Sequence, residues 1–350
     1  MTEKKKSSAS KRKKMLWWQV PLLVLLVAGT YYIAYMRQTA PYHMDSGLIF
    51  GTVYNVTYQH EDNLKAEIEA ELKRVDQEFS MFNEQSTVSK LNRGEATTLS
   101  DMFMEVYRMA ATINRETTGA FDITVAPLVN AWGFGFKHEQ LPNAQQVDSL
   151  RDFIGMRHLI FDEKRRSISK DDSRVMLDFS AIAKGYGADC VARVLARNGV
   201  KNYMVEIGGE VVTRGSSPKS APWRIGVTKP TEDSLQTSQE LQTVLNVTNM
   251  AMATSGNYRN FYYNGGRKYA HTINPLTGYP VQHSLLSATI LASDCATADA
   301  YATAFMVLGV DGAKAVLGHH PELMAYLIYS DESGNYAVWY SPKLKDKIVQ

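Results

Sequence analysis

The chain has 350 residues, of which 45% are hydrophobic and 21% charged, a composition that excludes a disordered or low-complexity protein. Residues 1–14 hold seven basic residues against one acidic residue, a net charge of +6. Because the whole chain carries +2, the remainder carries −4. A slightly acidic body gives no reason to expect nucleic acid as a partner.

The basic tail is followed by a long uncharged segment, Met15–Met36. Its 22 residues are enough for a helix across a hydrocarbon core of about 30 Å, and aromatic residues stand near both of its ends. The positive-inside rule places the tail in the cytoplasm and residues 37–350 outside, with 37–47 as a linker. The alternative is a signal peptide cleaved near Val27-Ala28-Gly29, but the length of the segment favours an uncleaved anchor.

The predicted elements after the linker mix strands and helices. Residues 47–60 are rich in β-formers and predict a strand, whereas 63–82 show the helical spacing of apolar residues. Further expected elements are a helix at 101–119, a hairpin formed by 158–170 and 175–180, a helix at 181–199, strands at 203–215 and 223–230, and a last helix at 297–309 stopped by Gly309. Without strict βαβ alternation, this order predicts an α+β fold. The two cysteines, Cys190 and Cys295, are expected to be buried free thiols.

The usual phosphate, zinc and hydrolase motifs are absent from the sequence. Two quieter stretches could bind an anion. In "DFSAIAKGYGAD", Asp178 precedes a helix whose first turns carry Ser180, a candidate N-cap, and Lys184. In "VEIGGE", paired glycines allow close approach of a ligand or of another strand. A capped helix with a solvated lysine and a purely structural glycine pair are the alternatives.

Two further stretches could carry chemistry. In "ATADAYATAF", Asp299 and Thr303 lie four residues apart on one helix face, where oxygen ligands among alanines suit Mg²⁺. In "KYAHTINPLTGYPV", His271 precedes a turn that contains Asn274-Pro275. The histidine is either a packed structural residue or a group that handles a proton at the edge of a site. An Asp–Thr surface pair remains the alternative for the first stretch.

Taken in order, these stretches resemble the FAD:protein FMN transferase (ApbE) family. The resemblance rests on "SMFNEQSTVSKLN", "TTGAFDITVAPLVNAWGFG", "LDFSAIAKGYGAD", "VEIGGEV", "MATSGNYRNFYYNGGRKYAHTINPLTGYPV" and "TADAYATAFMVLG". It implies a single mixed α+β domain of ApbE type, tunnelling-fold-like, at 48–345. It also implies an enzyme that takes FAD, transfers FMN to a threonine hydroxyl of a partner protein and releases AMP with the help of Mg²⁺.

The resemblance also implies roles for individual residues. Asp299, Thr303 and the backbone oxygen of Ala181 would bind the metal, and Asp178 and Lys184 would face FAD. Further FAD contacts are expected from Phe50, Phe82, Ala120, Phe121, Asp122 and Ile273. Phe50 stands where the family commonly has methionine, which leaves an aromatic ring for stacking.

His271 matches the histidine of the family's "H…P..TG" turn and, with Asp299, is expected to be catalytic. It would help to deprotonate the attacking threonine or orient the phosphate. The family's targets are flavin subunits of membrane redox complexes, which implies a single-pass protein of the bacterial inner membrane with its catalytic domain on the periplasmic side. Hydrolysis of FAD to FMN and AMP, or a membrane-anchored FAD-binding protein without catalysis, are the alternatives.

Overall fold

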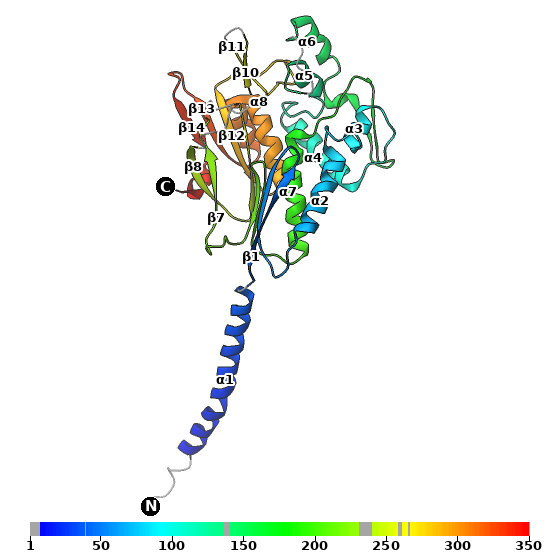
Figure 1. The fold of residues 1–350 in the computed structure, drawn as a ribbon. Helices are drawn as coiled ribbons and strands as arrows, with labels where there is room; N and C mark the ends of the chain where they lie inside the picture. Colours follow the sequence, from blue (N-terminus) through cyan, green and yellow to red (C-terminus); the bar gives the residue numbers. More distant parts are fainter. Residues whose placement is uncertain are drawn as a thin grey trace, which may run out of the picture.

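The structure, a computed structural model, describes residues 8–38, 40–135, 141–230, 240–257, 261–264 and 267–349. Helix α1 (Ser8–Gln38) projects away from the folded domain (Figure 1). Its described apolar side chains are exposed, for example Leu25 at 70%. The expected linker at 37–47 is shorter than predicted, because α1 runs to Gln38 and the first strand already begins at Tyr42.

An eight-stranded antiparallel sheet forms the middle of the domain, in the order β1-β2-β5-β6-β9-β12-β13-β14. Its strands are β1 (Tyr42–Ile49), β2 (Thr52–Gln59), β5 (Tyr203–Ile207), β6 (Glu210–Arg214), β9 (Met250–Gly256), β12 (Leu285–Ala292), β13 (Met324–Ser330) and β14 (Tyr336–Tyr340). The sheet and the helices around it confirm the predicted mixed α+β fold.

Helices lie on one side of this sheet, and α7 and α8 pack directly on it (Figure 1). They are α2 (Lys65–Phe79), α3 (Thr87–Asn92), α4 (Asp101–Glu116), α5 (Ala126–Ala131), α6 (Ala144–Arg151), α7 (Ser180–Arg197) and α8 (Cys295–His319). The predicted amphipathic helix is α2, which buries Ile68, Leu72, Val75 and Phe79 at helical spacing. α7 and α8 pack on each other and on the sheet, and the largest hydrophobic core lies between these layers.

The other face of the sheet packs on a small three-stranded sheet of β7 (Trp223–Thr228), β8 (Leu241–Val247) and β15 (Ile348–Val349). Val227, Leu245 and Val247 of the small sheet form a second core with Met252 and Leu291 of the large one. Two hairpins complete the fold: β3 (Leu159–Asp162) with β4 (Ser167–Lys170), and β10 (Phe261–Asn264) with β11 (Arg267–Ala270). Short 3-10 helices lie at Met156–His158 and Pro342–Lys347.

Three predicted elements were wrong in detail. Residues 47–60 are not one strand, because Phe50 and Gly51 form a tight turn between β1 and β2. The hairpin expected from 158–170 and 175–180 forms within the first of these segments alone. The last helix does not stop at Gly309: that residue adopts φ 72° and ψ −175°, and helix α8 resumes after this kink. Cys190 and Cys295 are free and buried, as predicted.

Among the described residues, one helix is long and apolar enough to cross a membrane. This helix is α8, with a mean hydropathy of 1.3, and half of the stretch is buried inside the domain. That burial is the behaviour of a core helix in a folded domain. A shorter apolar helical stretch, Gln19–Ala34, lies within α1.

Candidate active site

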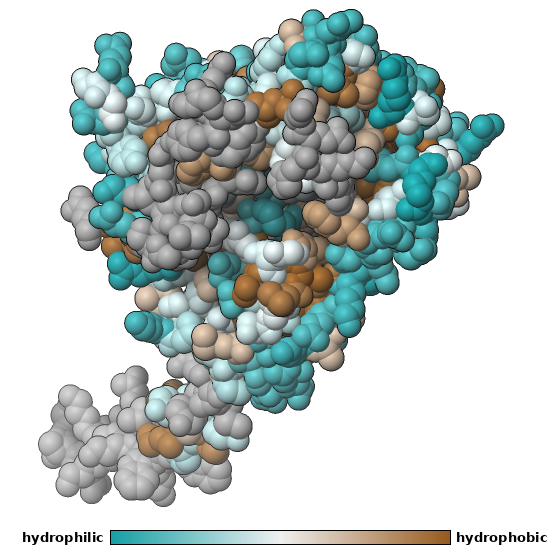
Figure 2. Space-filling model, turned by 45° about the horizontal axis from the view of Figure 1, so that its top comes forward, coloured by the Kyte–Doolittle hydropathy of each residue, from teal (hydrophilic) through white to brown (hydrophobic). Residues whose placement is uncertain are grey.

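A cavity of about 700 Å³ lies beside the β1–β2 turn. Figure 2 views the domain with the end opposite α1 turned forward and shows a recess bordered by hydrophobic surface. We call the cavity of about 700 Å³ the aromatic cavity. Its walls come from the β1–β2 turn, the end of α2 with the loop after it, α5, the start of α7 and the loop after β11. The lining includes Phe50, Phe79, Met81, Phe82, Val129, Phe134, Asp178, Ser180, Lys184 and His271.

Phe50 is placed by an unusual turn. Phe50 and Gly51 both have positive φ, 52° and 71°, as a two-residue hairpin turn requires. The left-handed conformation costs a non-glycine residue roughly 1–2 kcal/mol. The Phe50 ring lies so close to Gly187 of α7 that a Cβ there would be 2.7 Å from its Cε2. Phe82, by contrast, is 85% exposed at the rim of the cavity.

Ser180 was the predicted N-cap of α7, but the N-cap is Phe179, whose side chain makes no capping hydrogen bond. Asp178 Oδ1 accepts a hydrogen bond from Ser180 N at 2.8 Å, and Ser180 is already the first helical residue. The Asp178 backbone N donates to Ile123 O at 2.7 Å, which joins α7 to the segment after α4. Burial raises the pKa of the Asp178 carboxyl, and the hydrogen bonds from Ser180 oppose that shift.

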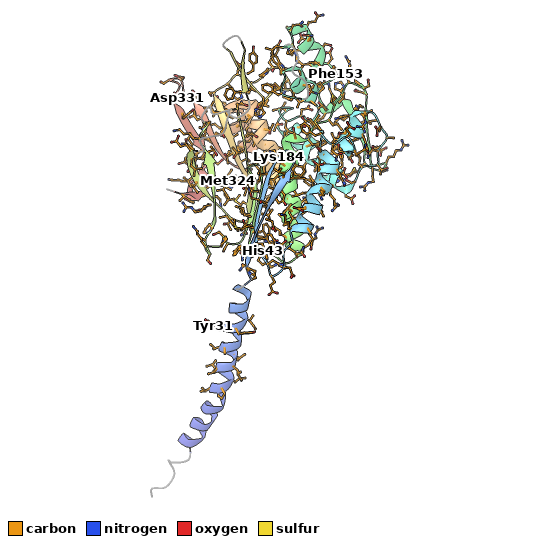
Figure 3. All side chains as sticks on the ribbon, in the orientation of Figure 1. Tyr31, His43, Phe153, Lys184, Met324 and Asp331 are labelled. Carbon is orange, nitrogen blue, oxygen red and sulfur yellow. The ribbon has the colours of Figure 1, made fainter. Side chains whose placement is uncertain are left out.

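Lys184 lies near the centre of the domain, between α7 and the large sheet (Figure 3). Its Nζ is 2.6 Å from Oε1 of Glu210, whose side chain is 4% exposed. Burial disfavours the Lys184 ammonium, but the charges of Asp299 and Glu210 outweigh this and raise its pKa. Burial raises the pKa of Glu210 to about 7 against the opposing effect of Lys184. Burial also raises the pKa of Asp299, which Lys184 again opposes.

One of the predicted metal ligands, Asp299, contacts α7 at the residue after Lys184. Asp299 is 3% exposed, and its Oδ2 accepts a hydrogen bond from Gly185 N at 3.0 Å. In a regular helix this same N–H faces the carbonyl of Ala181, four residues earlier. Regular helix geometry would therefore bring the Ala181 carbonyl close to the Asp299 carboxylate. Close packing makes this possible, because a Cβ on Gly185 would be 2.3 Å from the carbonyl oxygen of Cys295 at the start of α8.

The donor set fits a hard divalent cation. It offers a carboxylate, a carbonyl and the hydroxyl of Thr303, whose Oγ1 is 3.3 Å from Ser255 Oγ. Nearby, Glu210 Oε2 is buried and has no hydrogen-bond partner among the described residues. Within the described ranges, no three His, Cys, Asp or Glu side chains form a metal-binding group. A cation here would therefore rely on the carbonyl and hydroxyl oxygens beside Asp299.

The turn after β11 places His271 on the wall of the aromatic cavity. Asn274 Oδ1 accepts hydrogen bonds from the backbone N of Leu276 and of Thr277, at 2.8 and 3.2 Å. The turn is fastened to the domain by Trp132, whose Nε1 donates to Gly278 O at 2.7 Å. The His271 ring has Phe134 edge-on, with 6.4 Å between ring centroids. The rigid turn thus holds the imidazole at the mouth of the cavity.

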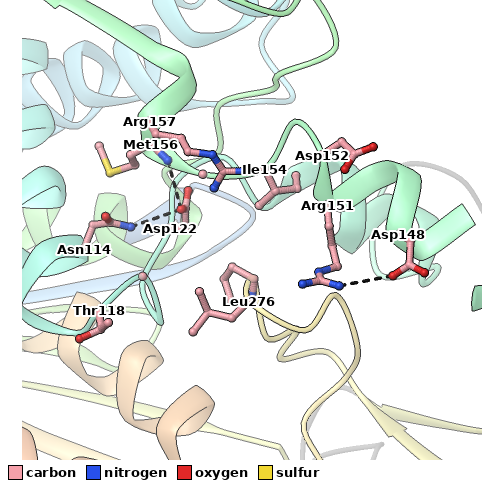
Figure 4. Close-up of a pocket in the computed structure, with 13 residues that line it drawn as sticks. Asn114, Thr118, Asp122, Asp148, Arg151, Asp152, Ile154, Met156, Arg157 and Leu276 are labelled. Atoms are coloured by element: carbon pink, nitrogen blue, oxygen red, sulfur yellow. Dashed lines mark hydrogen bonds and ion pairs between the residues drawn. The ribbon is translucent and has the colours of Figure 1, made fainter.

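The remaining predicted FAD contacts do not line this cavity. Ala120, Phe121 and Ile273 are buried, at 2%, 2% and 4% exposed. The Asp122 carboxylate faces a second cavity of about 750 Å³, which we call the polar cavity. Figure 4 shows it, with Asp122 bonded to Asn114 and to the Met156 backbone, and with Arg151 paired to Asp148. The 271–279 turn contributes His271 to one cavity and Pro275 and Leu276 to the other.

Two residues of the site were missed at the level of sequence. Glu210 stands directly after the Gly208-Gly209 turn, and only the sheet brings it against Lys184. Ser255 reaches Thr303 from β9. The glycine pair was the available clue. A Cβ on Gly208 would be 2.8 Å from Thr52 Cγ2 of β2, so that glycine permits the approach of a neighbouring strand.

The fold is that of the flavin transferases. A solved structure named flavin transferase ApbE from Vibrio cholerae aligns with a TM-score of 0.78 at 34% identity, and covers 88% of this chain and 100% of its own. The apo flavinyl transferase ApbE of Pseudomonas stutzeri aligns with a TM-score of 0.77 at 30% identity, over 88% of this chain and 96% of its own.

The chain itself belongs to the ApbE family. The model of that family matches residues 50–328. A relative from Haemophilus influenzae, named FAD:protein FMN transferase, is 37% identical over 304 residues, which cover 83% of this chain and 87% of the relative. An Escherichia coli relative of the same name is 33% identical over 293 residues, or 82% of each chain.

Proposed function

We propose that this chain is an FAD:protein FMN transferase, which transfers FMN from FAD to a threonine hydroxyl of an acceptor flavoprotein and releases AMP. Membership of the ApbE family and the names of its relatives support the flavin-transfer class. One observation carries the assignment to this cavity. Lys184 lines an aromatic cavity of about 700 Å³, pairs with the buried Glu210 and interacts electrostatically with the buried Asp299.

The transfer exchanges one P–O bond for another. The threonine Oγ forms a bond to the phosphorus of the FMN half, the bond from that phosphorus to the AMP oxygen breaks, and AMP leaves with the electron pair. The hydroxyl proton passes to a base on the protein. Mg²⁺, held by Asp299, Thr303 and the Ala181 carbonyl, would neutralise charge that develops on the phosphate oxygens. Lys184 adds a fixed positive charge at the same place.

His271 is the proposed base, or the residue that orients the phosphate. It lines the aromatic cavity from a turn held by Asn274 and Trp132. General bases of this kind contribute about 10²–10⁴-fold to a rate. The rings of Phe50 and Phe82 offer surfaces on which a flavin or adenine ring could stack. Asp178 would face FAD from the start of α7. Ala120, Phe121, Asp122 and Ile273 do not line the aromatic cavity and would affect FAD binding only through the residues around them.

We further propose that α1 anchors the chain in the bacterial inner membrane, with the basic tail in the cytoplasm and the domain at 48–345 in the periplasm. The apolar stretch Gln19–Ala34 and its exposed side chains support this location. The positive-inside rule supports the orientation. The acceptor would then be a threonine-bearing flavin subunit of a membrane redox complex on the same side.

The decisive experiment mixes the full chain in detergent with FAD, Mg²⁺ and a candidate acceptor domain. Acceptor mass and released AMP are measured together. We expect a gain of one FMN, reduced by about 10³-fold or more in Asp299→Ala, because the only proposed carboxylate ligand is lost. Asp148→Ala, which removes an exposed carboxylate of the polar cavity, is the matched control and should match the unmodified chain.

Other outcomes would assign a different function. AMP without a gain in acceptor mass would indicate hydrolysis of FAD to FMN and AMP. FAD that stays bound, with neither product formed, would indicate a membrane-anchored FAD-binding protein without catalysis.

A further inference from the structure

Glu210 is a buried carboxylate with an incomplete set of partners. It is the first residue of β6 and only 3% exposed. Its Oε1 pairs with Lys184 Nζ at 2.6 Å, whereas its Oε2 is buried without a hydrogen-bond partner among the described residues. Burying a carboxylate is unfavourable unless both of its oxygens are satisfied. Stability alone therefore does not explain a glutamate at this position.

The charges around Glu210 are also unequal. Lys184 interacts electrostatically with both Glu210 and Asp299, so one positive charge faces two carboxylates. When all three are ionised, the group carries a net charge of −1. Arg193, on the same helix, differs: it pairs with Glu105 at 2.8 Å, and both side chains are more than 40% exposed. The excess negative charge is thus buried beside Lys184, which lines the aromatic cavity, and water screens a buried charge least.

We propose that Glu210 makes phosphate binding in the aromatic cavity depend on a divalent cation. With Asp299 it outweighs the charge of Lys184, so this group of charges repels a phosphate until a cation is bound. A bound divalent cation makes the net charge of this group positive. Lys184 and the cation then both contact the phosphate. Glu210 touches neither FAD nor the acceptor in this scheme. It acts through its negative charge and through its ion pair with Lys184. This inference rests on the proposed use of FAD and Mg²⁺.

The test compares FAD affinity in EDTA and in saturating Mg²⁺, measured by quenching of flavin fluorescence on the full chain in detergent. At pH 8, Glu210 is mainly ionised, because its pKa is about 7. In the unmodified chain, we expect Mg²⁺ to tighten FAD binding by about 100-fold or more. In Glu210→Gln, FAD should bind about tenfold more tightly in EDTA, so the gain from Mg²⁺ shrinks about tenfold.

Three controls keep the result specific. Glu105→Gln removes a carboxylate paired with Arg193 on the outer side of α7 and should retain the full dependence on Mg²⁺. Riboflavin lacks phosphate, so its binding should change with neither Mg²⁺ nor Glu210→Gln. Glu210→Met removes the charge without adding an amide to a buried position and should repeat the result if Glu210→Gln folds poorly.

An unchanged gain from Mg²⁺ in both Glu210 variants would overturn the inference, and so would a change in riboflavin affinity equal to the change in FAD affinity. The proposed transfer is tested separately by acceptor mass. If FAD binding depends on Mg²⁺ through Glu210 but no acceptor gains FMN, the inference holds and the transferase assignment fails. If acceptors gain FMN while the Glu210 variants keep the full dependence on Mg²⁺, the transferase assignment holds and the inference about Glu210 fails.

Discussion

The aromatic and polar cavities lie on either side of the 271–279 turn and have similar volumes, about 700 and 750 Å³. Each has a buried carboxylate near it, but the two carboxylates differ in their partners. Asp122, at the polar cavity, accepts hydrogen bonds from Thr124 N, Thr124 Oγ1, Met156 N and Asn114 Nδ2, at 2.6–3.3 Å. Glu210, at the aromatic cavity, has one oxygen without such a partner in the described part of the chain.

This difference predicts different roles for the two carboxylates. The hydrogen bonds of Asp122 fasten α4 to the segment around Met156, and they leave no lone pair that calls for a ligand. The charged groups beside the aromatic cavity are buried and unbalanced, which is the usual sign of a site that binds something charged. Volume alone would not have distinguished the two cavities.

Of the variants compared between the two cavities, His271→Ala should have the largest effect on activity. His271→Ala should lower the rate of FMN transfer by about 10²–10⁴-fold, because the attacking hydroxyl loses its base. FAD affinity should stay within about threefold of the unmodified chain. The measurement pairs the rate of acceptor mass gain with flavin fluorescence quenching. Full activity in this variant would make His271 a structural residue.

A smaller effect on activity is expected when the contact between the 271–279 turn and α6 is disturbed. Gly278 has φ +80°, and a Cβ there would lie 2.5 Å from Val147 Cγ1 and 2.9 Å from Arg151 Cδ. Gly278→Ala should lower the free energy of unfolding by about 1–3 kcal/mol, from conformational strain and steric overlap together. It should also slow transfer, because His271 is displaced.

The control for this variant is Gly334→Ala, at a glycine with φ +82° and nothing within 4 Å of a Cβ. It isolates the conformational part of the cost. Denaturant unfolding of both variants gives the comparison, and equal losses of stability would show that contact with α6 contributes nothing.

The smallest expected effect is on FAD affinity, when one apolar side chain is removed from the lining of either cavity. Phe50→Ala should weaken FAD binding by about tenfold, because an aromatic stacking surface is lost. Leu276→Ala, which removes an apolar side chain at the polar cavity that is 52% exposed, should change FAD affinity less than twofold. Fluorescence titration of both variants measures the difference. A larger effect from Leu276→Ala would move the flavin into the polar cavity.

Periodicity predicted the elements whose burial follows a simple pattern. α2 was found because Ile68, Leu72 and Val75 repeat at helical spacing and are all buried. The β1–β2 turn was missed because Phe50 gives none of the usual glycine or asparagine signals for two residues with positive φ. Gly309 was interpreted as a stop, although the apolar residues beyond it let α8 continue after the kink.

The candidate site was predicted in part, for a related reason. Lys184 and Asp299 stood in short stretches that could be recognised along the chain. Glu210 is 26 residues from Lys184 in sequence and joins it only through the pairing of β5 with β6. Asp122 illustrates the opposite case, because it lines the polar cavity whereas its sequence neighbours Ala120 and Phe121 are buried and line neither cavity. Pairings of this kind depend on tertiary contacts that local patterns do not contain.

Strand β1 acts as a spacer. It starts at Tyr42, soon after α1 ends at Gln38, and its eight residues lead directly to Phe50 at the aromatic cavity. At about 3.4 Å per residue, the strand spans roughly 27 Å. If α1 is the anchor, the cavity is carried at a nearly constant height above the lipid surface. An acceptor threonine would have to stand at that height, so the length of one strand would help to select which membrane complexes receive a flavin.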